Sequence, residues 1–381
     1  MGNWKTCTIG DLGAVVGGAT PSTKKAENYD GGTISWITPK DLAGFSGRFI
    51  TRGERNITEQ GLKSCSTKLM PAHTVLFSSR APIGYIAIAE QEVCTNQGFK
   101  SVVPNENTDY MFLYYLLKYN KYKIENFGSG TTFKEVSGST MRGIEVSVPK
   151  TIEEQRRIAS VLSTLDDKIE QNTEINKNLL QQIEALFKSR FLSYNALPFG
   201  WKQMTLGDVS EMSAGGDKPK TISDQKTEAC QYPVYSNGTS DEGLYGFTTE
   251  YKISSESVTV SARGSIGFVC LRHIPYTPIV RLVTLVPRES IISAKYLYLW
   301  LKSIPIHGTG TTQQQLTIPD FQKTEIIIPP EEDMRAFTET VNPLFHQVWS
   351  NQDENTKLAD VRDALLPQLM SGKLDVSDIE I

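Results

Sequence analysis

The stretch IASVLSTLDDKIEQNTEINKNLLQQIEALFKSR, residues 158–190, decides the fold of this chain. Its apolar residues recur at alternating spacings of four and three, the heptad pattern of a helix that packs lengthwise against another helix. The seam positions are Ile158, Leu162, Leu165, Ile169, Asn172, Asn176, Leu179, Ile183, Leu186 and Arg190. Two asparagines therefore interrupt a largely apolar seam.

A second seam follows 179 residues further along the chain, and it repeats both asparagines. Its positions are Phe337, Val341, Leu344, Val348, Asn351, Asn355, Leu358, Arg362, Leu365 and Leu369. A buried amide on a seam is tolerated only opposite a polar partner. We therefore predict two antiparallel helices in a register that places Asn172 opposite Asn355 and Asn176 opposite Asn351, with paired numbers summing to 527. The alternative is that each helix packs only against its own globule.

The regions before the two helices also repeat each other. Trp4, Lys5, Ile9, Gly10 and Asp11 return as Trp201, Lys202, Leu206, Gly207 and Asp208; SSRAPIG at 78–84 returns as SARGSIG at 261–267; Gly130, Thr131 and Thr132 return as Gly310, Thr311 and Thr312. We predict an α+β chain with an internal pseudo-twofold repeat, in which two tandem globules are joined by two long helices that form an antiparallel coiled coil. The predicted boundaries are 1–150, 151–197, 198–330 and 331–381. Such a rod would hold two similar surfaces apart at a fixed distance, which suits a partner whose own structure is repeated.

Composition places the chain among globular proteins and argues against several classes of function. At 381 residues with 39% apolar content, it is long enough for two or three domains with real cores. It has no apolar run of membrane length and no signal-peptide pattern, and its five cysteines are scattered without a CxxC, so we expect a cytoplasmic protein with reduced thiols.

Charge is distributed unevenly along the chain. Residues 1–150 carry 17 Lys/Arg against 13 Asp/Glu, residues 198–330 carry 12 against 12, and residues 331–381 carry 4 against 11. The net charge of −4 is therefore concentrated in the second helix and its tail. The globules can bind DNA, although a chain this weakly basic would bind it poorly alone.

The motifs of common catalytic sites are missing from the sequence. Four histidines, with neither HExxH nor a Cys/His cluster, predict no metal site, and there is no Walker loop or GxGxxG. Asn342-Pro343-Leu344-Phe345 resembles the tetrapeptide with which amino-methyltransferases hold a flipped adenine. Because it lies within the second seam and lacks an accompanying glycine-rich cofactor motif, we interpret it as helix packing.

Polar and basic loops of the globules carry the candidate contacts to DNA. In the first globule they are Thr20, Ser22, Thr23, Lys24, Lys25, Arg80, Asn96, Gln97, Thr131, Thr132 and Lys134; in the second they are Lys218, Lys220, Asn237, Arg263, Arg281, Thr311, Thr312 and Gln313. Arg80 and Arg263 occupy the same place in the repeated motif, at the end of an apolar strand, where a guanidinium can contact guanine or phosphate in a bidentate way. A structural ion pair is the competing role for these arginines. Solvated turns compete equally for the lysines and amides.

Several stretches resemble the DNA-specificity subunits of type I restriction-modification systems, and the likeness covers nearly the whole chain. The most specific are ITPKDL at 37–42, SSRAPIG at 78–84, NQGF at 96–99, IEVSVPKTIEEQRRIASVL at 144–162 and ALLPQLMSGKLDV at 364–376. The resemblance implies that each globule is a target-recognition domain for one half of a bipartite double-stranded DNA site. It also implies that the helices form a spacer on which two modification (methyltransferase) subunits dock. It leaves open whether restriction subunits, which translocate and cut DNA, also join.

The resemblance implies a subunit without catalysis or cofactor of its own, because S-adenosylmethionine, Mg and ATP belong to partner subunits in that family. The second globule departs from the pattern, with Pro278-Ile279-Val280-Arg281 standing where the first has Thr95-Asn96-Gln97-Gly98. We therefore expect the globules to read different half-sites. A single-chain DNA methyltransferase and a coiled-coil scaffold without a DNA role are the alternative classes.

Overall fold

The computed structural model describes residues 4–130, 134–308 and 315–376, and it divides the chain into two compact units. The first unit comprises residues 1–174 and 351–381, and the second comprises residues 175–350. Each unit therefore combines one globule with a segment of both long helices, α6 (Ile152–Phe191) and α10 (Glu331–Met370).

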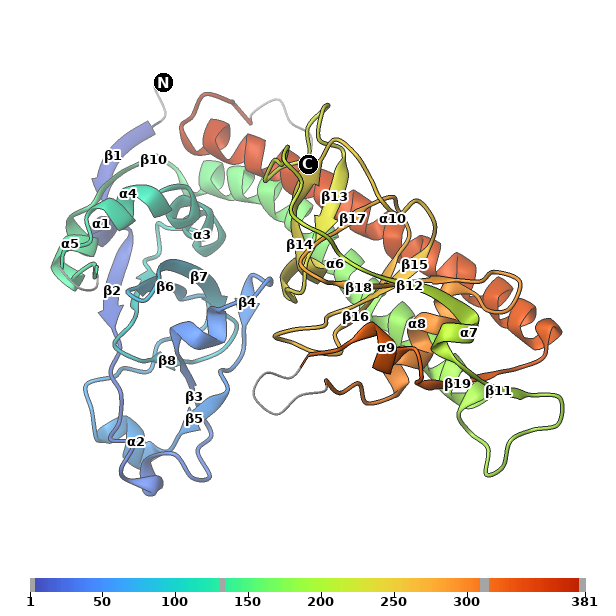
Figure 1. Ribbon diagram of the computed structural model, residues 1–381. Helices are drawn as coiled ribbons and strands as arrows, with labels where there is room; N and C mark the ends of the chain where they lie inside the picture. The colour runs from blue at the N-terminus through green and yellow to red at the C-terminus, as the bar shows by residue number, and fades with distance from the viewer. Residues whose placement is uncertain (1–3, 131–133, 309–314, 377–381) are drawn as a thin grey trace. The chain divides into compact units, whose positions relative to one another are not determined.

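The first unit contains three sheets, of five, three and two strands. The five-stranded sheet has the order β2-β9-β6-β7-β4, a three-stranded sheet has the order β5-β3-β8, and β1 pairs with β10 (Figure 1). The strands are β1 (Trp4–Thr8), β2 (Gly13–Gly17), β3 (Ile34–Ile37), β4 (Phe49–Ile50), β5 (Arg55–Ile57), β6 (Val75–Ser79), β7 (Ile83–Ala89), β8 (Cys94–Thr95), β9 (Lys100–Pro104) and β10 (Glu145–Pro149). The helices beside α6 and α10 are α1 (Ile9–Leu12), α2 (Glu59–Lys63), α3 (Tyr110–Tyr119), α4 (Lys121–Asn126) and α5 (Gly138–Gly143), with 3-10 turns at Ala26–Asn28 and Pro39–Leu42.

The second unit repeats this plan. A four-stranded sheet has the order β12-β18-β15-β16, a three-stranded sheet has the order β14-β13-β17, and β11 pairs with β19. The strands are β11 (Lys202–Thr205), β12 (Ser210–Ala214), β13 (Tyr232–Tyr235), β14 (Leu244–Thr248), β15 (Ser257–Val260), β16 (Val269–Arg272), β17 (Thr277–Pro278), β18 (Val283–Pro287) and β19 (Glu325–Ile328). The shorter helices are α7 (Leu206–Val209), α8 (Ala294–Ser303) and α9 (Ile318–Phe321), with a 3-10 turn at Ser240–Gly243.

Local chemistry is repeated along with the element order. Thr8 and Asp11 close a capping box at α1, and Thr205 and Asp208 close the same box at α7. The hydrogen bonds from the threonine lower the pKa of both aspartates. The repeat seen in the sequence is therefore also a repeat of caps and strand pairs.

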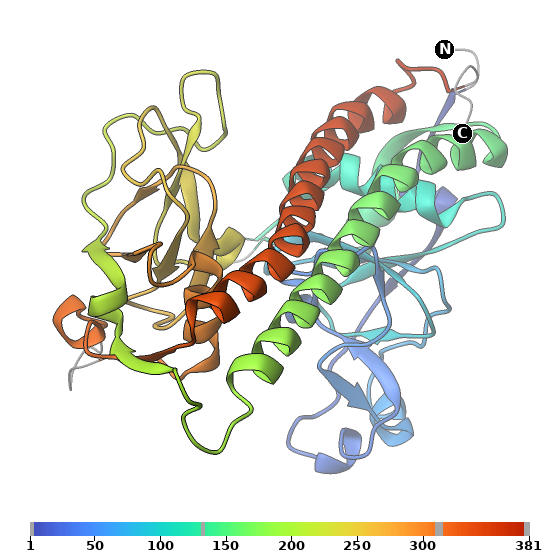
Figure 2. The same ribbon diagram turned by 90° about the vertical axis from the view of Figure 1, so that its right-hand side faces the viewer.

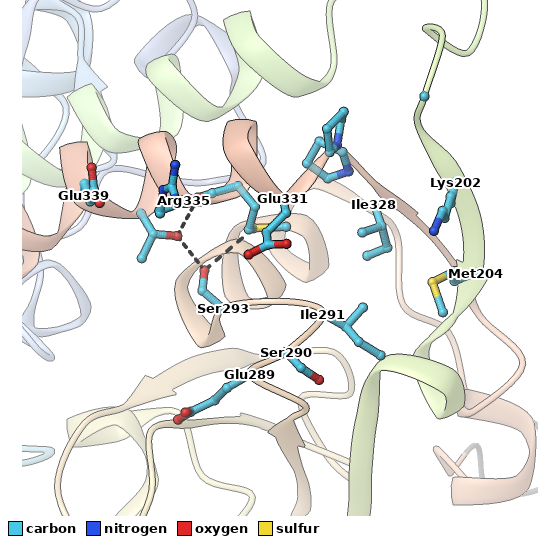
Figure 3. Close-up of a pocket in the computed structure, with 15 residues that line it drawn as sticks. Lys202, Met204, Glu289, Ser290, Ile291, Ser293, Ile328, Glu331, Arg335 and Glu339 are labelled. Carbon is cyan, nitrogen blue, oxygen red and sulfur yellow. Dashed lines mark hydrogen bonds between the residues drawn. The ribbon is translucent and has the colours of Figure 1, made fainter.

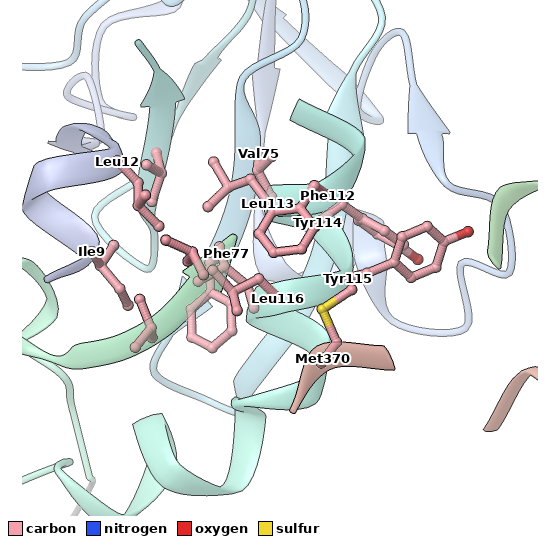
Figure 4. Close-up of a cluster of buried hydrophobic side chains, with 14 of the residues drawn as sticks. Ile9, Leu12, Val75, Phe77, Phe112, Leu113, Tyr114, Tyr115, Leu116 and Met370 are labelled. Atoms are coloured by element: carbon pink, nitrogen blue, oxygen red, sulfur yellow. The ribbon is translucent and has the colours of Figure 1, made fainter. Parts of the chain in front are cut away.

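The core of the first unit lies between its large sheet and helices α1, α3, α6 and α10. Phe77 of β6 and Phe112 of α3 are fully buried, and Met370 from the end of α10 packs into the same cluster (Figure 4). Ile158 and Leu162 of α6 belong to it as well. This unit is therefore completed by residues from both ends of the chain.

Helices α6 and α10 lie side by side and run in opposite directions within each unit (Figure 2). In the second unit, Phe187 and Phe191 of α6 pack against Phe337 of α10, with ring centroids 5.8 Å and 5.0 Å apart. These three rings belong to the core that Tyr296 of α8 also joins. The helices thus pack against each other, as predicted, and each also packs against a globule.

The prediction that Leu186 and Arg190 lie on the seam is wrong. The side chain of Leu186 is 41% exposed, while Phe187 and Phe191 are buried. The seam moves by one residue at this end of α6 because the aromatic core of the globule takes the helix face that carries the two phenylalanines. Similarly, Phe345 is buried on α10 and its neighbour Leu344 is only partly buried.

Candidate functional site

In the first unit, the loop after β2 is held against the turn after β8. The Ala19 N–H donates to the Thr95 carbonyl at 3.0 Å, and the Thr20 hydroxyl donates to Oε1 of Gln97. Gly18 makes this approach possible, since a Cβ there would lie 2.1 Å from the Thr95 oxygen. The structure therefore brings together two predicted contact residues that are 77 positions apart.

The other predicted residues of these two segments differ in their roles. Asn96 accepts the Gly98 N–H at 2.8 Å, so its side-chain oxygen stabilises the turn itself. Ser22, Thr23, Lys24 and Lys25 are exposed, and the Lys25 ammonium lies 3.9 Å from Glu27. Lys24 and Lys25 therefore remain accessible to an anionic partner.

Arg80 follows β6 and is held by an ion pair. Its Nη1 lies 3.4 Å from Oε2 of Glu135, whose Oε1 lies 3.2 Å from Nζ of Lys100. The Arg80 side chain is still 35% exposed. The ion pair that the sequence offered as the competing role is therefore present, and part of the guanidinium stays exposed. Lys134, beside Glu135, is exposed, and Thr131 and Thr132 lie outside the described residues.

Arg263 occupies the same position in the second unit with a different partner. Its Nη2 donates to Oε1 of Gln315 at 2.9 Å, and the side chain is exposed. The equivalence rests on a shared backbone hydrogen bond, from Val136 to the Ser79 carbonyl in the first unit and from Leu316 to the Ala262 carbonyl in the second, both 3.0 Å long. Arg263 is therefore held by a neutral amide where Arg80 is held by a carboxylate. Thr311, Thr312 and Gln313 lie outside the described residues.

Asn237 links two segments of the second unit. Its Oδ1 accepts the Ala262 N–H and its Nδ2 donates to the Val280 carbonyl, both at 2.7 Å. These neighbours directly precede Arg263 and Arg281. Asn237 therefore has a positioning role in the fold, and it sets the backbone beside two predicted contact residues.

The two predicted lysines of the second unit lie on its surface. Lys218 donates to the Tyr245 hydroxyl at 2.9 Å and lies 4.7 Å from the centre of the Tyr245 ring. Lys220 is exposed. The phenol therefore orients one ammonium, which leaves both cations at the surface.

The sequence prediction missed Glu135, Lys100 and Gln315. The signal was present, because Glu135 and Gln315 are 180 residues apart, the same offset that relates Gly130 to Gly310. These residues do not match the pattern of a DNA contact, because they hold other side chains in place instead of facing the DNA themselves.

On the helices, Asn172 donates from Nδ2 to Oδ1 of Asn355 at 2.9 Å and to Oε2 of Glu354 at 2.7 Å. The first of these joins the two asparagines that the register of 527 sets opposite each other. The hydrogen bond from Asn172 lowers the pKa of Glu354. In the second unit, Asn176 donates to the Val348 carbonyl at 3.1 Å, and in the first unit Asn351 is buried.

A buried polar network joins the first globule to both helices. Asp166 of α6 accepts the Tyr115 hydroxyl through Oδ2 and Nη1 of Arg362 through Oδ1, each at 2.6 Å. Burial and the carboxylate raise the pKa of Tyr115, so the phenol stays a donor. Arg362 on the predicted seam is thus compensated by an acidic neighbour.

A second polar contact joins the globule to α6 close by. Arg48, only 4% exposed, pairs with Asp167 and, at 2.9 Å, with Glu170. The guanidinium also donates from Nη1 to the Ser163 carbonyl at 3.5 Å. The first globule is therefore fastened to α6 by charges as well as by its apolar core.

A cavity of about 660 Å³ in the second unit opens between the first turns of α10, the loop before α8 and strand β11 (Figure 3). Its lining carries both signs of charge, from Lys202 and Arg335 and from Glu289, Glu331 and Glu339. None of the predicted DNA contacts lines it. Within the described residues no group of three His, Cys, Asp or Glu side chains could hold a metal ion, and no helix is long and apolar enough to span a membrane.

Comparison with known proteins identifies the family. The family model of the type I restriction modification DNA specificity domain matches residues 1–185 and 198–357. The MjaIX specificity subunit of a type I restriction enzyme from Methanocaldococcus jannaschii is 34% identical over 414 residues, covering 99% of this chain and 95% of that protein. The Escherichia coli EcoR124I/EcoR124II specificity subunit is 30% identical over 205 residues, covering 52% of this chain and 48% of that protein.

A solved structure supports the fold. The type-I restriction-modification S subunit from M. genitalium matches with a TM-score of 0.63 at 18% identity, covering 97% of this chain and 96% of that one. With the family model matching both halves and a relative alike over nearly its whole length, the chain belongs to the type I restriction-modification DNA specificity family.

Proposed function

We propose that this chain is the sequence-specific DNA-recognition subunit of a type I restriction-modification complex and that each unit reads one half of a bipartite target. The observation that carries the proposal is the repeated arginine: Arg80 and Arg263 follow equivalent strands, each is held by one side chain, and each keeps exposed surface. An arginine fixed in this way is preorganised for a bidentate contact to guanine or phosphate. The two relatives described above are both specificity subunits of type I restriction enzymes, which agrees with this role.

We propose that α6 and α10 act together as an antiparallel coiled-coil spacer between the half-sites and relate the two units by a pseudo-twofold axis. The Asn172–Asn355 hydrogen bond supports a fixed register, because a slip of one heptad would oppose an asparagine to an apolar residue and leave a buried amide unpaired. Residues 173–179 and 348–354 form the matched heptads whose removal would preserve the sum of 527.

Exchanging residues 1–150 for those of a relative is expected to change one half-site of the DNA target and leave the other unchanged. The reason is that each unit contains its own sheets and its own strand-end arginine. Methylome sequencing of cells that carry the exchanged chain gives both half-sites at once. A change in both would contradict the proposal. The incoming segment must also pack against Leu369 and Met370 of α10, so the melting temperature of the chimera is the control.

Arg263→Ala is expected to weaken binding of the assembled complex to its target by about 1 to 3 kcal/mol while the protein melts normally. Arg80→Ala should weaken binding similarly. It should also lower the melting temperature slightly, because it removes one of the two cations paired with Glu135 among the described residues. Fluorescence anisotropy with target duplex at two salt concentrations, beside thermal melting, makes the comparison. A large loss of stability with unchanged affinity would assign both arginines to purely structural roles.

Modification subunits are proposed to dock on the helices and their flanks. The second helix and its tail carry 4 Lys/Arg against 11 Asp/Glu, which disfavours DNA and suits a protein partner. Deleting α10 would not test this, because the core of the first unit would be lost with it.

Reversing the charges of Glu331 and Glu339, which border the mixed-charge cavity at the start of α10, is a milder test. Glu331→Lys with Glu339→Lys is expected to abolish co-purification with the modification subunit at physiological salt without changing the melting temperature. Glu228→Lys, on an exposed loop of the same unit, is the matched control and should leave assembly intact. If the double variant co-purified with the modification subunit as well as the wild type does, the docking site would lie elsewhere.

Methyl transfer is proposed to take place on the partner subunits, which would bind S-adenosylmethionine, with Mg and ATP on restriction subunits if these join. This chain would contribute the two surfaces that select the sequence of the DNA duplex. The family's name, a DNA specificity domain, agrees with a recognition role.

A further inference from the structure

The turn after β17 holds two residues in a conformation that side chains disfavour. Val280 has φ of 52° and Arg281 has φ of 60°, both in the left-handed region. For a β-branched residue such as valine this is a genuine outlier, and it persists only where surrounding structure enforces it. Strained backbone of this kind gathers at functional sites.

Three hydrogen bonds enforce this turn. The Val280 N–H donates to the Gly216 carbonyl at 2.9 Å, the Arg281 N–H donates to the Gly215 carbonyl at 2.8 Å, and the Val280 carbonyl accepts Nδ2 of Asn237 at 2.7 Å. Position 215 requires glycine, because a Cβ there would lie 2.7 Å from the backbone nitrogen of Ile279. Hydrogen bonds therefore hold the N–H groups of Val280 and Arg281 and the carbonyl of Val280.

The side chains that this turn exposes are unusual for a protein surface. The Val280 side chain is 52% exposed, and the Arg281 side chain is exposed and makes no hydrogen bond or ion pair with the described part of the chain. Neither side chain stabilises the fold in a way that would justify the strain. An apolar group and an unpaired guanidinium, held side by side, form a contact surface for something outside the chain.

The first unit presents different chemistry at the same place. Ile279 donates to the Tyr235 carbonyl at 2.9 Å, and Asn96 donates to the Ile37 carbonyl at 3.0 Å, so the two turns begin from the same backbone contact. Two residues of parallel strand pairing precede each turn: β17 runs parallel to β13, and β8 runs parallel to β3. Val280 and Arg281 therefore stand where the first unit has Gln97 and Gly98.

We propose that Val280 and Arg281 are the base-reading residues of the second unit, with Val280 against the methyl group of a thymine and Arg281 on an adjacent guanine. This rests on the proposed function. Thymine alone presents a methyl group in the major groove, and the O6 and N7 atoms of guanine match a guanidinium in a bidentate way. Adjacent Cα atoms lie about 3.8 Å apart and successive bases on one strand about 3.4 Å apart, so neighbours in the chain can contact neighbours in the duplex.

The test uses the complex assembled with its modification subunits and a duplex that carries both half-sites, as mapped by methylome sequencing. Each thymine of the second half-site is replaced in turn by deoxyuridine, which removes only the methyl group. One replacement is expected to weaken binding by the wild type about fourfold, the value of one buried methyl-sized group.

The Val280→Gly variant separates an effect on DNA binding from an effect on folding. Glycine adopts positive φ readily, so this variant should melt no lower than the wild type. It should bind the normal duplex about as weakly as the wild type binds the deoxyuridine duplex, and it should be indifferent to that replacement. Arg281→Lys keeps the charge but loses the planar fork, and it should lose sensitivity to 7-deazaguanine, which lacks N7, at the neighbouring position.

Two results would overturn the inference: deoxyuridine at every thymine weakening the wild type and Val280→Gly equally, or a second half-site without a T·A pair beside a G·C pair. In either case binding that still depends on both half-sites would leave the proposed function standing. A complex that binds duplexes without regard to half-site sequence would overturn both proposals.

Discussion

A chain that ends at Asp363 is expected to lose the folded first unit while the second unit stays folded. The missing segment carries Leu366, Leu369, Met370 and Val376, all buried in the core of the first unit. Burying four such side chains contributes about 6 to 12 kcal/mol. A whole domain has a net stability of only about 5 to 15 kcal/mol, so the first unit should not survive the loss.

Limited proteolysis followed by mass spectrometry would measure this result, with cleavage expected throughout residues 4–150 and protection within 202–349. A chain that ends at Val376 is the matched control, since it keeps all the core residues and should resist protease like the complete chain. Equal protection of the first unit in both truncated chains would show that the end of α10 is dispensable.

Asp166→Ala is expected to destabilise the first unit by about 3 to 5 kcal/mol, the effect of breaking a buried ion pair by removing one partner. Asp166 is 5% exposed and is bonded at once to Tyr115 and Arg362. Its loss leaves a buried hydroxyl without its acceptor and weakens the neutralisation of a guanidinium. Thermal unfolding followed by circular dichroism measures the shift.

Asp363→Ala serves as the control for this substitution. Asp363 also pairs with Arg362, at 2.8 Å, but its side chain is 60% exposed, so its removal should cost under about 1 kcal/mol. If the two alanine variants melted at the same temperature, burial of the network would not be what stabilises this unit.

Much of the architecture could be predicted because it depends on periodic patterns. The two long helices and the position of Asn172 opposite Asn355 follow from heptad spacing and from the need to pair a buried amide. The seam failed at Leu186, where the aromatic residues of a globule compete with the other helix for one face of α6. Heptad rules describe the packing of two helices on each other. They cannot predict that a globule competes for the same helix face.

The candidate contacts were harder to predict, because a residue type does not reveal its partner. Arg80 and Arg263 look alike in the sequence, yet one is held by Glu135 and the other by Gln315. Asn237, predicted as a contact residue, also fixes the backbone at Ala262 and Val280. The strain at Val280 could not have been predicted, because left-handed backbone is expected of glycine or asparagine rather than valine.

The division of the chain into units has a consequence for its synthesis on the ribosome. Residues 175–350 are continuous, so the second unit can close as soon as they have emerged. The first unit is translated earlier but needs residues 351–376, and until they arrive the apolar face of α6 around Ile158 and Leu162 stays uncovered. The globule made first is therefore finished last. Nascent chains must therefore keep an exposed apolar surface soluble until the end of α10 has been made. A stop codon late in the message would yield a product whose second unit folds and whose first unit is open to degradation.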